Sequence, residues 1–123
     1  GLEFVRQLLL RGCAVVGTHR QAHAPEPLQA LAVSQGLRFL QMDVADPRSI
    51  QCAAKALEAQ GTALTHIIHS AGIYGPQGTL DGRGRKGRAD APAVTKDAMM
   101  TVFEVNAVGP LLVAQAFAPL LKP

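Results

Sequence analysis

Apolar residues in the first third of the chain alternate between helical and strand-like spacing. Between residues 2 and 9 they recur every three or four positions, which predicts a helix that ends at Gly12. The short apolar run 13–18 then predicts a strand, and the region 28–35 predicts a second helix. Residues 37–44 form the next apolar run and predict a second strand. This order of helices and strands is typical of repeated βαβ units.

The middle of the chain continues the same alternation. Asp46 followed by Pro47 predicts a helix start, because an acid caps the free N–H groups and proline fits the first helical position. Apolar residues form one stripe over the region 50–57, which is expected to face the core, and Gly61 ends this helix. Residues 65–70 predict a third strand, buried and ending in small side chains.

The last third is expected to hold a long loop followed by a long helix. Gly, Arg and Pro are frequent in the region 74–94, which predicts a flexible loop. A helix is expected from about Thr95, with the polar Asn106 at its centre and a helix-breaking Gly-Pro pair at 109–110. Together the elements predict an α/β fold, a doubly wound parallel sheet with flanking helices, in one domain over residues 1–123.

The composition agrees with a layered globular domain and argues against several classes of function. Hydrophobic residues make up 48% of the chain, charged residues 17% and aromatic residues 4%, which suits aliphatic helices packed on a sheet. The net charge is only +3 and much of the basic excess lies in the loop, so no nucleic-acid partner is expected. No apolar stretch reaches the roughly 20 residues of a membrane span and no cleavable leader is visible, so we expect a cytoplasmic protein without a membrane partner.

The cysteines and histidines predict neither a disulfide framework nor a metal site. Cys13 and Cys52 both lie among apolar residues and are expected to be buried thiols. His66 and His69 are three positions apart on a predicted strand, so their side chains point to opposite faces and cannot share one metal ion.

Two glycine features are candidates for a phosphate-binding turn. The segment 82–87 matches G-x-G-x-x-G, but no strand precedes it and no apolar helix follows, so we attribute this match to chance. Gly1 is the stronger candidate, because it precedes an apolar helix that leads into a predicted parallel strand. It would be the last glycine of such a fingerprint, with the first strand and the earlier glycines upstream of this chain.

Two side chains at predicted strand ends bear on the choice of nucleotide. In an NAD-specific unit an acid follows the second strand and holds the ribose hydroxyls, whereas this chain has Arg20 there. A guanidinium binds a 2′-phosphate through two hydrogen bonds, which favours NADP(H); the alternative is a solvated loop arginine. Asp43 ends the next strand and can accept a hydrogen bond from the adenine amino group; the alternative is a turn or capping acid.

Three motifs resemble those of the short-chain dehydrogenase/reductase family and follow the family's order along the chain. The segment 69–72, His-Ser-Ala-Gly, stands where the family has Asn-Asn-Ala-Gly at the end of its fourth strand. Asp43 with Val44 resembles the family's adenine-binding Asp-Val pair. Asn106 resembles the Asn of its catalytic tetrad.

The resemblance covers nearly the whole chain, apart from an insert over about residues 77–92. The segments 71–75 and 106–121 are most similar to the C-signal and sniffer-like carbonyl reductase branch. This resemblance implies a partial Rossmann domain that binds NADP, with NAD as the alternative. It also implies hydride transfer between the nicotinamide and a small carbonyl or alcohol substrate.

The resemblance also implies roles for single residues. Ser70, Ala71 and Gly72 would bind the cofactor, because small residues let the backbone approach its ribose. Asn106 would distort its own helix and hold a water of a proton relay with its main-chain carbonyl. The helix after Thr95 resembles one that often packs across a dimer interface, so a homodimer is a further expectation.

The chain departs from the family in the residues that would deliver a proton. The family uses Tyr-x-x-x-Lys with an upstream Ser, whereas the only tyrosine here is Tyr74 and the residue four positions later is Gly78. His69 and Ser70 also replace two Asn side chains that brace neighbouring strands in the family. We therefore interpret the chain as the cofactor-binding part of a longer reductase, inactive alone. The alternative is a non-catalytic Rossmann protein that binds a dinucleotide or acts in signalling.

Overall fold

The computed structural model describes residues 1–79 and 92–122. Apart from the strand predicted at 65–70, its helices and strands follow the order that the apolar spacing predicts, with small shifts at their ends. They are α1 (Leu2–Leu10), β1 (Val16–His19), α2 (Glu26–Gln35), β2 (Arg38–Gln41), α3 (Pro47–Ala59), α4 (Lys96–Phe103), a π-helical turn (Glu104–Val108), α5 (Gly109–Phe117) and a final 3₁₀ turn (Ala118–Leu120).

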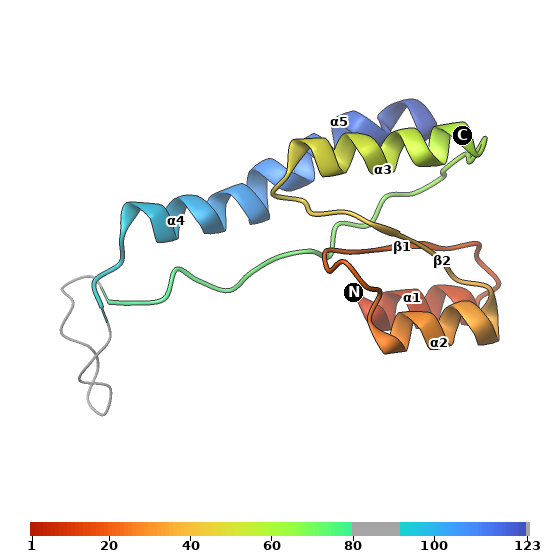
Figure 1. Cartoon of the computed structure of the whole chain (residues 1–123), viewed down its shortest axis with the longest axis horizontal. Helices are drawn as coiled ribbons and strands as arrows, with labels where there is room; N and C mark the ends of the chain where they lie inside the picture. The colour runs from red at the N-terminus through yellow and green to blue at the C-terminus, as the bar shows by residue number, and fades with distance from the viewer. Residues whose placement is uncertain (80–91, 123) are drawn as a thin grey trace.

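The two strands form a parallel pair that lies between two layers of helices. Val16 lies opposite Arg38 and His19 opposite Gln41, so the carboxyl ends of both strands meet at one edge. Figure 1 shows α1 and α2 on one face of this pair, and α3 and α5 on the other. The predicted parallel sheet with helices on both faces is therefore confirmed as a partial Rossmann-like arrangement.

The core lies on the α3 side of the sheet. The Asp46 side chain accepts a hydrogen bond of 2.9 Å from the Arg48 N–H, so α3 begins at the predicted cap. The stripe predicted on α3 is buried against α5 and β2. Its members and their partners are Met42, Ile50, Ala53, Ala54, Leu57, Val113, Phe117 and Leu120.

Residues 65–70 do not form the predicted buried strand. None of its residues makes a sheet-type bridge to the other described residues; Leu64, directly before it, makes a parallel one to Leu121. Ile68 is 51% exposed, although the prediction placed it in the interior. A strand needs the N–H and C=O groups of a neighbour, and in the described residues β1 and β2 pair with each other and not with this segment.

The Gly-Pro pair at 109–110 does not end the last helix, which is a second correction. The helix runs from Lys96 to Leu120, 25 residues, through a π-helical turn directly before the pair. In a regular helix the Pro110 ring would clash with the Asn106 carbonyl and leave it without a donor. The wider turn absorbs this conflict, because the Gly109 N–H bonds to Glu104 five residues back instead of four.

This helix also bears on the expectation that no membrane span is present. By length and composition alone, the run Lys96–Leu120 could cross a membrane, so the sequence-based statement that no stretch is long enough was wrong. Its inner residues Val113 and Phe117 are buried against α3. Core helices of water-soluble proteins have the same length and composition, so this finding assigns no membrane role.

One smaller expectation also changes. Cys13 and Cys52 are both exposed, because Cys13 lies in the connection between α1 and β1 and Cys52 lies outside the buried stripe of α3. Within the predicted loop 74–94, the Thr79 N–H donates to the Pro92 carbonyl at 3.0 Å; the predicted flexibility of this loop stays a prediction. The glycine-rich match at 82–87 lies outside the described residues.

Candidate functional site

The centre of the candidate site is a pair of hydrogen bonds between a helix side chain and an extended backbone. The Asn106 Oδ1 atom accepts from the Ile73 N–H at 2.8 Å, and the Asn106 Nδ2 atom donates to the Ile73 carbonyl at 2.8 Å. The Asn106 side-chain amide thus satisfies both the N–H and the C=O of Ile73, which lies in a segment without a strand partner. This pair fixes the end of the segment 65–73 against the last helix.

The main-chain carbonyl of Asn106 lies in the π-helical turn, where the regular helix ladder is interrupted. Its usual donor would be the N–H of residue 110, and that residue is proline. The distortion expected at Asn106 is therefore present in the structure, and it comes from Pro110 as well as from the turn itself. A carbonyl without its ladder donor is an acceptor for another partner.

Two glycines allow this arrangement by close approach. A Cβ atom on Gly72 would lie 3.3 Å from the Asn106 Oδ1 atom, so a side chain there would press on the Ile73 pair. A Cβ atom on Gly109 would lie 2.7 Å from the Val44 carbonyl oxygen, well inside van der Waals contact. The last helix therefore packs directly against the segment that follows β2.

Asp43 and Val44 lie in that segment, at the carboxyl end of β2. The Asp43 Oδ1 atom accepts from the Ala45 N–H at 2.9 Å, which closes a short turn, and the Asp43 N–H donates to the Ser49 hydroxyl at 2.9 Å. One carboxylate oxygen of Asp43 has no hydrogen bond among the described residues. Asp43 thus closes a turn, and its second carboxylate oxygen is available as an acceptor; its predicted role toward adenine stays a prediction.

Gly1 lies beside Ser70 at the start of α1, and Ala71 follows Ser70 in the chain. A Cβ atom on Gly1 would lie 3.1 Å from the Ser70 Oγ atom, so the helix start and the extended segment approach each other closely. All three residues are exposed. The free N–H groups at the start of a helix carry a partial positive charge, which suits the phosphate groups expected beside Gly1.

Arg20 directly follows β1 and is exposed. Within residues 1–79 and 92–122 the structure shows an ion pair only between Arg6 and Glu3, so the Arg20 guanidinium has no carboxylate partner there. The Arg20 carbonyl accepts from the Gln41 side chain at 3.4 Å, which ties its backbone to β2. The Arg20 backbone is thus tied to the edge of the sheet where Asp43 also lies.

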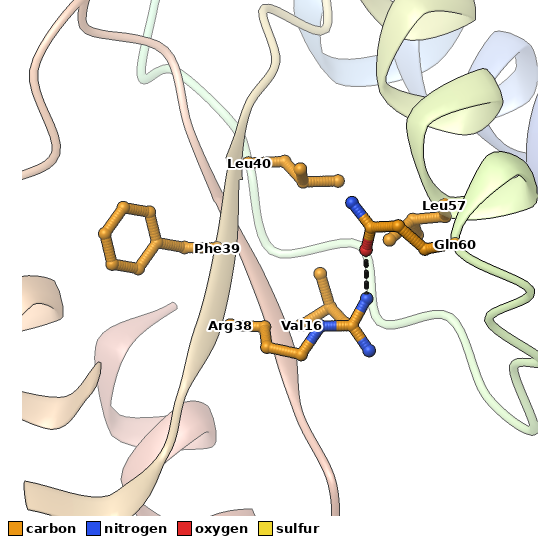
Figure 2. Close-up of a pocket in the computed structure, with 6 residues that line it drawn as sticks. All are labelled: Val16, Arg38, Phe39, Leu40, Leu57 and Gln60. Atoms are coloured by element: carbon orange, nitrogen blue, oxygen red, sulfur yellow. Dashed lines mark hydrogen bonds between the residues drawn. The ribbon is translucent and has the colours of Figure 1, made fainter. Parts of the chain in front are cut away.

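A pocket of about 200 Å³ lies elsewhere on the molecule, at the N-terminal ends of β1 and β2. Figure 2 shows Arg38 bonded to Gln60 at its rim, with Leu40 and Leu57 toward the pocket and Phe39 on the other side of the strand. Arg38 also donates to the Thr62 hydroxyl at 2.9 Å. The Arg38 guanidinium is therefore already hydrogen-bonded to neighbouring side chains. None of the predicted site residues lines this pocket.

Three supporting residues were missed from the sequence. Ile73 contributes through its backbone, Ser49 holds the Asp43 turn, and Gly109 provides the close approach to Val44. The Gly-Pro pair was a signal for Gly109, but it was interpreted as a helix end. A backbone partner such as Ile73 leaves no mark in the type of side chain.

Comparison with known proteins supports one family for the whole chain. Residues 1–123 match the short-chain dehydrogenase family model described as enoyl-(acyl carrier protein) reductase. (+)-Neomenthol dehydrogenase of Arabidopsis thaliana is 35% identical over 99% of this chain and 45% of its own length. Human retinol dehydrogenase 5 is 32% identical over 94% of this chain and 33% of its own length. The chain thus spans less than half of either relative.

Solved structures agree with this comparison. An NADPH-bound carbonyl reductase from chicken fatty liver has a TM-score of 0.79 and 31% identity, over 98% of this chain and 43% of that one. A short-chain dehydrogenase/reductase from Burkholderia multivorans with bound NADP has a TM-score of 0.76 and 28% identity, over 99% of this chain and 50% of that one. The sequence match and the shared fold place this chain in the short-chain dehydrogenase/reductase family.

Proposed function

We propose that the whole protein is an NADP(H)-dependent reductase of small carbonyl compounds, and that this chain is its cofactor-binding part. The observation that carries the proposal is the hydrogen-bonded pair of Asn106 with Ile73, next to Gly72 and the open edge of the sheet. It joins the end of the extended segment to a helix whose carbonyl lacks its ladder donor. The NADPH-bound carbonyl reductase with 31% identity supports the same activity class.

The residues at the carboxyl-terminal edge of the sheet have the small size and the charges that a bound dinucleotide requires. Gly1 and Gly72 leave space that a Cβ atom would fill, at 3.1 Å from Ser70 and 3.3 Å from Asn106. Arg20 offers an unpaired cation for a 2′-phosphate, and Asp43 keeps an acceptor for an adenine amino group. When bound, the nicotinamide supplies the hydride that reduces the carbonyl carbon.

The residues of this chain would then bind and orient rather than donate the proton. Asn106 would hold the Gly72–Ile73 backbone in place, and its main-chain carbonyl, to which Pro110 can donate no N–H, would fix a water in a proton relay. The chain contains one tyrosine, and Gly78 stands four positions after it, so it supplies no Tyr-x-x-x-Lys pair. The proton donor and the neighbouring lysine would come from sequence outside this chain, as would most of the substrate pocket.

The first test of the cofactor proposal is the affinity of the whole protein for NADPH and NADH. We expect NADPH to bind more tightly, and Arg20→Ala to weaken NADPH binding by about tenfold while NADH binding is unchanged, because one bidentate phosphate contact is lost. Arg11→Ala is a matched control, since Arg11 is exposed but follows α1 instead of β1. An unchanged preference in Arg20→Ala would contradict the assignment of the 2′-phosphate.

A second test separates the reductase from a non-catalytic dinucleotide-binding protein. We expect the whole protein to consume NADPH when offered a panel of small ketones and aldehydes, followed by the loss of NADPH absorbance. Asn106→Ala should lower this rate by a larger factor than it weakens NADPH binding, because Asn106 acts near the reacting end of the cofactor. NADPH binding without turnover on any carbonyl compound would favour the non-catalytic alternative.

The last helix also supports the proposal of a homodimer. Four large apolar side chains are exposed along it, which would be covered if two copies pack through this helix. They are Met99, Met100, Phe103 and Leu111. We further propose a cytoplasmic location for the whole protein, to be tested by fractionation of cells that express it.

A further inference from the structure

The pocket of about 200 Å³ lies at the other end of the sheet from the candidate site. Val16 begins β1 and Arg38 begins β2, and both residues line the pocket. The candidate residues Arg20 and Asp43 instead follow the carboxyl ends of these strands. Each strand has four residues, which span about 13 Å of extended chain. A molecule bound in the pocket would therefore leave the candidate site open.

The walls of the pocket are apolar. Figure 2 shows Leu40 and Leu57 directed toward the pocket, with Phe39 on the other side of β2. Leu57 is 2% exposed, and the half-buried Val16 and Leu40 pack against the same core. A protein cavity of roughly 150 Å³ is large enough to bind benzene, so this pocket has room for one aromatic ring or a short aliphatic chain.

The Arg38 guanidinium at the rim is held in place and keeps free donors. Its Nη2 atom donates to the Gln60 Oε1 atom and, at 2.9 Å, to the Thr62 hydroxyl. A guanidinium has five N–H groups, and those on Nη1 and Nε have no acceptor in the described parts of the chain. Glu58, the acid nearest to Gln60 in sequence, forms no ion pair with Arg38. The cation is thus oriented by neutral groups and has no carboxylate partner within residues 1–79 and 92–122.

The Gln60 side chain adds a second donor to the rim. A guanidinium only donates hydrogen bonds, so the oxygen of the Gln60 amide must face Arg38. The Nε2 atom of the same amide is then turned away from Arg38, and Figure 2 shows it on the side of Leu40. It has no acceptor among the residues that the structure describes. The rim therefore offers N–H groups from two side chains above an apolar wall, which complements a ligand with an anionic end and an apolar body.

We propose that this pocket binds a small organic carboxylate, with its apolar body against Leu40 and Leu57 and its carboxylate at the rim. The carboxylate would accept from the Nη1 or Nε atom of Arg38 and from the Nε2 atom of Gln60, and the bond to the cation is the stronger of the two. Inorganic phosphate fits less well, because several of its oxygens would lie against apolar side chains without a donor. The site lies outside the proposed cofactor site and does not depend on it.

The first experiment compares benzoate, benzyl alcohol and inorganic phosphate in NMR titrations of the whole protein. The signals that report on the pocket are the methyl groups of Leu40 and Leu57 and the side-chain amide of Gln60. We expect benzoate to shift them with a Kd on the order of 1 mM, as suits a molecule of this size with one charged contact. Benzyl alcohol has the ring without the charge and should bind at least about tenfold more weakly. Phosphate has the charge without the ring and should not shift these signals.

Variants of the whole protein then test the charge and the wall separately. Arg38→Met keeps an apolar stem without the cation and should weaken benzoate binding by about tenfold or more, whereas Arg38→Lys keeps a charge and should lose less. Arg48→Met is the matched control, because Arg48 is exposed on the first turn of α3 and does not line the pocket. Val16→Phe places a ring in the pocket and should abolish binding. Arg38 is itself exposed, so its variants are expected to fold, and melting temperatures check this for all four.

The outcomes separate this site from the cofactor site. Benzoate-dependent shifts at Leu40, Leu57 and Gln60 that are lost in Arg38→Met, with NADPH affinity unchanged at saturating benzoate, would support the proposal. No shift of these signals, or equal benzoate affinity in Arg38→Met and Arg48→Met, would overturn it. Competition between benzoate and NADPH would also overturn it, because the benzoate would then lie at the carboxyl ends of the strands. Equal affinities for benzoate and benzyl alcohol would contradict recognition of the carboxylate.

Discussion

Helices α1 and α3 carry similar apolar stripes, yet only one of them is buried. On α3, Ile50 is 1% exposed and Leu57 is 2% exposed, because α5 and β2 cover this stripe. On α1 no residue is buried, and Phe4 is 57% exposed. The two helices differ in their neighbours rather than in their pattern. An apolar stripe predicts where a helix can pack, and the neighbouring elements decide how deeply it does so.

The candidate site lies between these packed and open regions. The Asp43–Val44 segment and the buried Gly109 belong to the packed side, where the last helix touches the end of β2. Gly1 and the segment 70–73 belong to the open side, where backbone groups are exposed. A rigid packed side and an accessible backbone on the open side suit a site that must bind a long cofactor.

The largest expected effect tests the packed region itself. Phe117 is 5% exposed and packs between α5 and α3, so Phe117→Ala should lower the free energy of unfolding by about 3–5 kcal/mol. Phe103→Ala, on the same helix but 56% exposed, is the matched control and should cost far less. Urea unfolding of the whole protein measures both variants. Equal costs at all protein concentrations would contradict the difference between the two regions.

The Phe103 control also tests the proposed dimer. If this face is covered by a second copy, the cost of Phe103→Ala should increase with protein concentration, because the dimer then contributes to stability.

A smaller effect is expected at the contact between the last helix and the end of β2. In Gly109→Ala the new Cβ atom would lie 2.7 Å from the Val44 carbonyl oxygen, so the two elements must separate. We expect a loss of about 1–3 kcal/mol in the free energy of unfolding. Gly17→Ala is the control, because its Cβ would meet Leu37 at an ordinary 3.8 Å. A loss in Gly109→Ala no larger than in Gly17→Ala would mean that this contact does not limit packing.

The smallest expected change in stability concerns the open side. Asn106→Ala removes both hydrogen bonds to Ile73, which are exposed, so the free energy of unfolding should fall by only about 1 kcal/mol. Hydrogen exchange of the Ile73 amide should nevertheless become much faster, because the Asn106 Oδ1 atom is its acceptor. In Asn106→Asp the acceptor is kept and the donor is lost. Slower exchange in that variant than in Asn106→Ala would assign the protection to Oδ1.

Much of the fold could be predicted because its signals are local. The Asp46-Pro47 start of α3 and the start of α4 at Lys96 both follow from capping side chains, and both are present in the structure. The predicted strand at 65–70 was wrong because strands depend on partners that the segment itself does not contain. The prediction that the Gly-Pro pair at 109–110 breaks the helix was wrong, because a π-helical turn can accommodate a proline that a regular helix cannot.

For the candidate site, the sequence determined which side chains have the required chemistry. Arg20, Asp43 and Asn106 were selected by residue type and by their positions after strands or within a helix. The tertiary structure alone decided their partners: Ile73 for Asn106, Ser49 for the Asp43 backbone and Val44 for Gly109. The physical reason is range. Capping and apolar periodicity act within a few residues, whereas the contacts of Asn106 with Ile73 and of Gly109 with Val44 join segments that only the packing of the last helix brings together.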